Sequence, residues 1–118
     1  MAKSIIQEKR FQFSLKIINT YQNLKTAKEF DLGRQLLRSG TSIGANVVEG
    51  KHAQSTLDFI HKLSIAQKEA AETEYWILLL KESNIIPHEN ADLLLIDCVE
   101  IQKIIAAIIT TLKKKSNK

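Results

Sequence analysis

Apolar residues recur every three or four positions over most of this chain, the spacing that places side chains on one face of an α-helix. The pattern predicts four helices, at about residues 4–27, 30–49, 55–83 and 88–115. In the last two helices the apolar steps alternate between four and three residues, as they do in helical bundles. The predicted core positions there are Phe59, Leu63, Ala66, Ala70, Thr73, Ile77 and Leu80, then Leu94, Cys98, Ile101, Ile105, Ile108 and Leu112.

The first helix has an apolar row of the same kind, with further apolar residues next to it. The row expected on its apolar face is Phe11, Leu15, Ile18 and Gln22, with Ile17, Tyr21 and Leu24 beside it. Side chains at these spacings share one side of a helix. The first helix therefore also qualifies as a member of a bundle.

Turn signals separate the four segments. Gly50 is expected just past the end of the second helix, where glycine is favoured. Ser55, with Asp58 three residues later, resembles a capping box and starts the third helix, and Asn84 and Pro87 mark the turn into the fourth. Short connections force neighbouring helices to run antiparallel. We therefore predict an all-α fold, an antiparallel up-down-up-down four-helix bundle, with residues 1–118 as a single domain.

The segment from Arg38 to Gly50 lies where the spacing predicts a helix, yet it is rich in glycine, serine, threonine and asparagine. These residues cost it roughly 3–4 kcal/mol of helix propensity relative to alanine. One face carries small and apolar residues, which let a neighbouring helix approach closely: Leu36, Gly40, Ile43, Val47 and Gly50, with Gly44 one turn beyond Gly40. Close helix packing is thus one explanation for the segment.

A second face of this segment is polar and consists of Gln35, Arg38, Ser42, Asn46 and Glu49. A face that only meets solvent usually carries better helix formers than Ser42 and Asn46. Short polar groups instead suggest hydrogen bonds to a neighbouring helix, a subunit or a ligand. Arg38, Ser42, Asn46 and Glu49 are therefore a candidate polar site, and a structural network is the preferred interpretation over an external binding site.

Composition adds charge to this picture, with 17 basic and 13 acidic side chains and a net charge of +4. Lys113, Lys114, Lys115 and Lys118 account for the whole excess, so the rest of the chain is about neutral. Such a tail either solubilises a helix end and suits its dipole or adds affinity for phosphate. Charge alone does not favour nucleic acid.

The fourth helix is more apolar than one core face requires, because fourteen of the twenty residues in 93–112 are apolar. A stripe of three residues in seven is enough for a single face. Leu95, Val99, Ala106 and Ile109 lie on a second face, which we interpret as an interface for self-association. The alternative is a helix with a broad core-facing side.

Several kinds of site and location are disfavoured. The lone Cys98 is expected to be a buried small hydrophobe and fits a reducing compartment. Asp97, Glu100 and Lys103 interrupt the longest apolar run, so no membrane span is expected, and the N-terminus does not resemble a signal peptide. A soluble cytoplasmic protein is the default.

Catalytic chemistry is equally hard to find. The Glu49/His52 and Asp58/His61 pairs do not match a di-metal bundle site, because both fall at one hairpin. The serines have no histidine and acid at triad spacing, no phosphate-binding loop or dinucleotide motif occurs, and the likeness to a helix-turn-helix is poor. We predict no metal, no cofactor and no enzyme.

The string Leu37-Arg38-Ser39, Ser42-Ile43, Asn46 and Glu49-Gly50 resembles the signature of the bacterial family encoded in 23S rRNA intervening sequences, often labelled S23 ribosomal protein. The resemblance continues through Asp58-Phe59, 63–66, 70–74 and 78–81. Gly44 departs from the family, in which proline is frequent, and Gly40-Thr41 stands where alanines are common. The resemblance implies an antiparallel four-helix bundle that forms a homo-oligomer, a ring of five. It also implies a fold similar to the accessory protein of diversity-generating retroelements, a basic pentamer that binds nucleic acid and a reverse transcriptase.

The preferred functional hypothesis is a non-enzymatic oligomeric scaffold that contacts RNA or an RNA-handling protein. Its expected phosphate contacts are Arg34, Arg38, Lys51, Lys62, Lys113, Lys114 and Lys115. The alternative is a structural or protein-interaction module without nucleic-acid binding, which the neutral body fits better.

Overall fold

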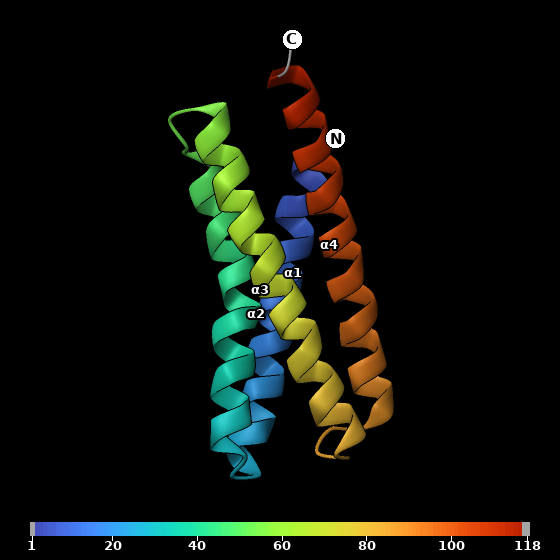
Figure 1. Ribbon diagram of the computed structural model, residues 1–118. Coiled ribbons are helices and arrows are strands. Elements are labelled where there is room, and N and C mark those ends of the chain that lie inside the picture. Colours follow the sequence, from blue (N-terminus) through green and yellow to red (C-terminus); the bar gives the residue numbers. More distant parts are fainter. Residues whose placement is uncertain (1, 117–118) are drawn as a thin grey trace.

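The computed structural model describes residues 2–116, with side chains from residue 5 to residue 115. These residues form α1 (Ala2–Thr26), α2 (Phe30–Lys51), α3 (Thr56–Glu82) and α4 (His88–Ser116). Each helix runs antiparallel to the next in a bundle about 52 Å long (Figure 1). The predicted all-α four-helix bundle is confirmed, and its helix boundaries lie close to those expected.

Neighbours in the chain are neighbours in space, and α1 also packs against α4. The pairs α1/α3 and α2/α4 are diagonal, because no Cα atoms of either pair come within 8 Å in the described residues. The start of α1, the end of α4 and the α2–α3 connection lie at one end of the bundle (Figure 1). The α1–α2 and α3–α4 connections lie at the other. We call the first of these the lysine end, because Lys51, Lys113, Lys114 and Lys115 are located there.

Two of the predicted turn signals behave as expected. The Ser55 hydroxyl caps α3 by accepting a hydrogen bond of 3.0 Å from the backbone N–H of Asp58. Asn84 has a left-handed φ of 59°, where asparagine is tolerated, and leads the chain into α4.

The prediction for Gly50 is wrong. α2 continues through Gly50 to Lys51, and Gly50 keeps a negative φ. A Cβ at this position would lie 2.9 Å from a ring carbon of Phe59. The absence of a side chain at Gly50 thus allows α3 to approach, rather than ending α2.

The core of α3 agrees with the sequence pattern. The buried side chains include Leu63, Ala66, Ala70, Thr73, Ile77 and Leu80. Only the first position differs, because Ile60 is buried and Phe59 is partly buried against the core. The alternation of steps of four and three therefore locates the α3 core well.

The core of α4 departs from the expected pattern near its C-terminal end. Leu94, Cys98, Ile101 and Ile105 are buried as predicted, but Ile109 is only 8% exposed whereas Ile108 and Leu112 are partly buried. A straight α-helix turns about 20° per heptad relative to a strict seven-residue repeat. The core-facing side therefore rotates along the helix, so that near its C-terminal end Ile109 faces the core in place of Ile108.

The apolar face of α1 is the main correction to the fold. Phe11, Leu15 and Ile18 are 56%, 46% and 39% exposed, whereas Phe13 and Ile17 are buried. Both sets have helical spacing, so periodicity alone does not tell which one faces the core. Packing against α2 and α4 selects the Phe13 and Ile17 side. The row Phe11, Leu15 and Ile18, which we call the α1 stripe, is left facing outward.

Candidate functional site

The segment from Arg38 to Gly50 forms the middle and end of α2, and its glycines lie where other helices come close. A Cβ on Gly40 would lie 2.8 and 2.9 Å from two side-chain carbons of Ile17 in α1. A Cβ on Gly44 would meet the Ser14 hydroxyl at 3.3 Å. These distances confirm that Gly40 and Gly44 permit close packing, and they identify α1 as the neighbouring helix.

The predicted hydrogen bonds of the short polar side chains are formed within α2 itself. The Ser42 hydroxyl donates to the carbonyl of Arg38 at 2.6 Å, and the Asn46 amide donates to the carbonyl of Ser42 at 2.8 Å. Among the described residues neither side chain bonds another helix. Of the three expected partners, a neighbouring helix is therefore not the one used within the described chain, whereas a subunit or a ligand stays a prediction. Bonds to the carbonyl four residues back satisfy these groups locally.

The charged members of the same face do connect α2 to α3. Arg38 forms ion pairs with Glu69 and Glu72 and a hydrogen bond with Gln35. The indole N–H of Trp76 donates to Glu72 at 2.9 Å, which holds that carboxylate in place. Glu72 thus accepts from two groups, and Arg38 is held by two carboxylates.

Glu49, near the end of α2, makes a second ion pair between α2 and α3. The Lys62 Nζ lies 3.1 Å from Glu49 Oε1. Exposed pairs of this type contribute about 0–1 kcal/mol each. The four candidate-site residues therefore do not converge on a common pocket. They divide into two groups bonded within α2 and two groups paired with α3.

A buried pair of hydroxyl groups also joins α2 to α3. Thr73 was an expected core position, whereas Ser39 was not. Ser39 and Thr73 are both fully buried, and their oxygens lie 2.9 Å apart. The Thr73 hydroxyl also lies 2.7 Å from the carbonyl of Glu69. Ser39 stands between the apolar and polar faces of α2. Its burial depends on the angle at which α3 packs, which spacing does not reveal.

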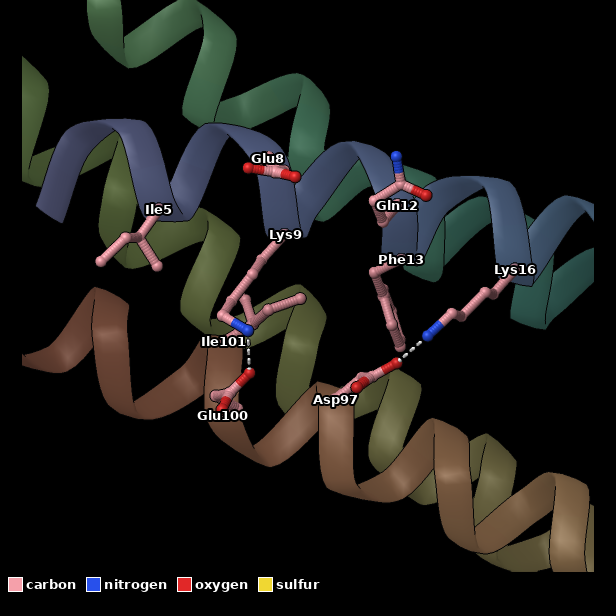
Figure 2. Close-up of a pocket in the computed structure, with 9 residues that line it drawn as sticks. All are labelled: Ile5, Glu8, Lys9, Gln12, Phe13, Lys16, Asp97, Glu100 and Ile101. Carbon is pink, nitrogen blue, oxygen red and sulfur yellow. Dashed lines mark hydrogen bonds and ion pairs between the residues drawn. The ribbon is translucent and has the colours of Figure 1, made fainter. Parts of the chain in front are cut away.

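Figure 2 shows a cleft of about 360 Å³ between α1 and α4. Two ion pairs cross it, Lys9 with Glu100 and Lys16 with Asp97, the second at 2.7 Å. The hydrogen bond to Glu100 raises the pKa of Lys9. Because both lysines already have carboxylate partners, the cleft attracts a further ion only weakly. Its charges tie α1 to α4.

Cys98 behaves as the sequence predicts. It is fully buried, and its Sγ lies 3.3 Å from the carbonyl of Ala70. Burial raises the pKa of the thiol to about 12. The thiolate is the nucleophilic form, so Cys98 is a poor nucleophile at neutral pH. Within the described part of the chain, no three His, Cys, Asp or Glu side chains are grouped so that they could hold a metal ion.

The predicted nucleic-acid contacts fall into two groups. Arg34, Arg38 and Lys62 are each paired with a carboxylate of the same chain, Arg34 with Asp31 at 2.6 Å. Lys51, Lys113, Lys114 and Lys115 are exposed and make no ion pair within residues 5–115. These four lysines share the lysine end, whereas Arg34 lies near the opposite end of α2 (Figure 1). Lys118 lies outside the described residues.

The predicted interface on α4 needs a correction. Ile109 belongs to the core, because the core-facing side of α4 rotates slowly along the helix. It is therefore not available to a second copy. Leu95, Val99 and Ala106 are partly exposed. The most exposed apolar side chains of α4 are Leu93 and Ile96, and comparable ones lie on α1 and α3.

The four-helix arrangement and the α2 segment agree with a known family. A family model described as 23S rRNA-intervening sequence protein matches residues 2–107. The chain belongs to the 23S rRNA-intervening sequence protein family. The resemblance stated from the residues of α2 and α3 is thereby confirmed, whereas the likeness to the retroelement accessory protein stays a prediction.

This 23S rRNA-intervening sequence protein is also similar to a solved structure. That structure is a protein of unknown function from the S23 ribosomal protein family of Bacteroides thetaiotaomicron. The two are 47% identical, the match covers 88% of this chain and 97% of that chain, and the TM-score is 0.86. A search of the curated proteins gave no match. In residues 2–116 no helix has the length and apolar character needed to cross a bilayer.

Proposed function

We propose that this chain is a non-enzymatic, self-associating scaffold whose lysine end contacts RNA. The observation that carries the RNA contact is a cluster of free lysines at one end, because the other exposed lysines without an ion pair in residues 5–115 are spread over the bundle: Lys25, Lys28, Lys68 and Lys103. Four exposed lysines without an ion pair among residues 5–115 lie at one end of a body that is otherwise about neutral. Unpaired lysines are available to replace the counterions of a phosphate backbone. The family's description names 23S rRNA, so a fragment of that RNA is the first ligand to test.

The RNA contact is tested with a labelled fragment of 23S rRNA over a range of salt concentrations. The triple variant Lys113→Gln, Lys114→Gln, Lys115→Gln should bind more weakly and lower the slope of log K against log salt by about 2, because three phosphate contacts are lost. The matched control removes three charges elsewhere, Lys28→Gln, Lys81→Gln and Lys103→Gln, and should change binding little. Absence of binding by the unaltered chain even at low salt contradicts the proposal.

Self-association is supported by the apolar side chains that the single chain leaves exposed. They occur on all four helices and include Phe11, Leu15, Phe30, Leu57, Tyr75, Leu78, Leu93 and Ile96. Where such side chains follow one another on a helix face, as Phe11 and Leu15 do, they form an apolar surface of the kind that marks a contact site. Light scattering at micromolar concentration should give a mass well above the 13.4 kDa of one chain. The ring of five implied by the family has five such chains, about 67 kDa. A mass of one chain refutes this part of the proposal.

The second candidate is a structural or protein-interaction module that does not bind nucleic acid. It is favoured by Arg34, Arg38 and Lys62, whose charges are already balanced by carboxylates of the same chain. A protein partner that stays bound after nuclease treatment, together with no shift of the rRNA fragment, would support this function over the first.

A further inference from the structure

Two exposed apolar stripes lie on diagonal helices of the bundle. The α1 stripe, Phe11, Leu15 and Ile18, follows steps of four and three and faces away from the core. The second stripe, which we call the α3 stripe, consists of Tyr75, Leu78 and Leu79, exposed by 56%, 41% and 37%. Because α1 and α3 are not in contact within the bundle, the two stripes are separate surfaces on different sides of the molecule.

Each stripe is flanked by one acidic and one basic residue. On α1, Glu8 precedes the stripe and Lys25 follows it. On α3, Lys68 precedes the stripe and Glu82 follows it. All four side chains are exposed, and none forms an ion pair within residues 5–115. On a helix of 100° per residue, each charge falls on the same side as the stripe that it flanks.

The order of charges is opposite on the two helices, and this decides how they can meet. A parallel contact places Glu8 near Lys68 and Lys25 near Glu82. An antiparallel contact places like charges together at both ends, which is unfavourable. The two flanking pairs are separated by 17 and by 14 residues, a difference of about 4.5 Å along the axis. Long charged side chains can span that difference.

We propose that the α1 stripe of one copy of this chain packs in parallel on the α3 stripe of a second copy. The proposal rests on the self-association proposed above and names its surfaces and direction. The contact is heterologous, because each copy uses α1 on one side and α3 on another. Since α1 and α3 run in the same direction within the bundle (Figure 1), all copies point the same way. Their lysine ends then lie on a single face of the assembly.

The charges are tested by reversal, with the mass followed by light scattering against concentration. The variant Glu8→Lys, Lys25→Glu should associate more weakly, with a dissociation constant about tenfold higher, because two attractions between copies become repulsions. The variant Lys68→Glu, Glu82→Lys should do the same. Combining all four substitutions should restore the association of the unaltered chain. Mixing the two weakened variants should restore it only in part in a ring of five, because an odd ring keeps at least one contact between like variants. The control Glu89→Lys, Lys103→Glu reverses two exposed charges of α4 and should leave the mass unchanged.

The direction of the contact is tested by disulfide formation between chains. Ile18→Cys in one chain and Leu79→Cys in another are near each other only in the parallel alignment, whereas Phe11→Cys and Leu79→Cys are near each other only in the antiparallel one. We expect the first mixture to form linked dimers and the second not to. A linked second mixture, or an oligomer whose mass is unaffected by charge reversal, overturns this contact while leaving self-association intact. An unaltered chain of 13.4 kDa overturns both.

Discussion

Ser39 and Thr73 show how one buried polar pair joins two helices. Both side chains are fully buried, and the Ser39 hydroxyl has Thr73 as its hydrogen-bond partner. Thr73 has a second contact, with the Glu69 carbonyl. A buried hydroxyl without a partner costs about 1–3 kcal/mol, whereas replacing both partners with apolar groups of similar shape can be nearly neutral. Loss of Thr73 therefore leaves the Ser39 hydroxyl without a partner, whereas loss of Ser39 leaves Thr73 with the Glu69 carbonyl.

We expect Thr73→Val to lower the free energy of unfolding by about 1–3 kcal/mol, because it leaves the Ser39 hydroxyl unpaired. Ser39→Ala should cost less, since Thr73 keeps the Glu69 carbonyl. The double variant should cost less than the sum of the two single changes, which is the signature of an interaction. Urea unfolding of the four proteins measures this cycle, and strict additivity would show that the hydroxyls do not interact.

At the level of the element, α2 is held by its neighbours and not by its own propensity. Its segment from Arg38 to Gly50 lacks roughly 3–4 kcal/mol of propensity relative to alanine. Gly40 and Gly44 let α1 approach, and Gly50 lets the Phe59 ring of α3 approach. Dispersion and burial at these close contacts offset the deficit. In this chain, part of the family signature is explained by helix packing.

The two glycines that face α1 should respond differently to alanine. Gly40→Ala places a Cβ within 3 Å of two branched carbons of the buried Ile17. Overpacking costs about 1–3 kcal/mol and exceeds the propensity gain of about 1 kcal/mol, so stability should fall. Gly44→Ala meets the rotatable Ser14 hydroxyl at 3.3 Å and two Arg10 carbons at an ordinary contact distance of 3.8 Å, and should be neutral or stabilising by up to about 1 kcal/mol. The midpoints of thermal unfolding of the two variants test this difference. Equal midpoints would mean that the Ile17 side chain moves to accommodate the new Cβ.

At the level of the whole molecule, the end-to-end distribution of charge matters more than the net charge. Four of the lysines that form no ion pair within residues 5–115, namely Lys51, Lys113, Lys114 and Lys115, lie at one end, and the proposed parallel contact turns those ends to the same side of the assembly. In the proposed assembly, several sites on one face would bind a single RNA together, which would raise avidity without new contacts. The small basic surplus of each chain would then become a larger basic surface only in the assembly.

This coupling predicts that dissociation weakens RNA binding even when the four lysines of the lysine end are intact. Lys68→Glu, Glu82→Lys leaves those four lysines and the net charge unaltered and adds no charge at the lysine end, yet should lower affinity for the 23S rRNA fragment at least about tenfold, because avidity is lost. The four-substitution variant should recover it. Gel shifts compare the RNA affinities of these proteins. They are run at a protein concentration at which the unaltered chain is oligomeric and the weakened variant is not. Equal affinities of the variant and the unaltered chain would show that RNA binding does not depend on assembly.

The sequence predicted the fold well and the surfaces less well. The α3 core and the Ser55 cap follow from local spacing and local hydrogen bonding, and both were found as expected. The face of α1 was assigned wrongly because that helix has two apolar rows with helical spacing. Ile109 was assigned to an interface because a strict alternation of fours and threes ignores the slow rotation of a straight helix.

By itself the sequence determined the four helices, their antiparallel order, the core of α3 and the family, because these depend on short-range periodicity, turn residues and a local signature. Tertiary structure decided the rest. It selected which α1 row is buried, brought Ser39 to Thr73 and Arg38 to Glu72, and left the α1 and α3 stripes facing outward. Spacing along one helix specifies its faces, but only the positions of the neighbouring helices specify which face is covered.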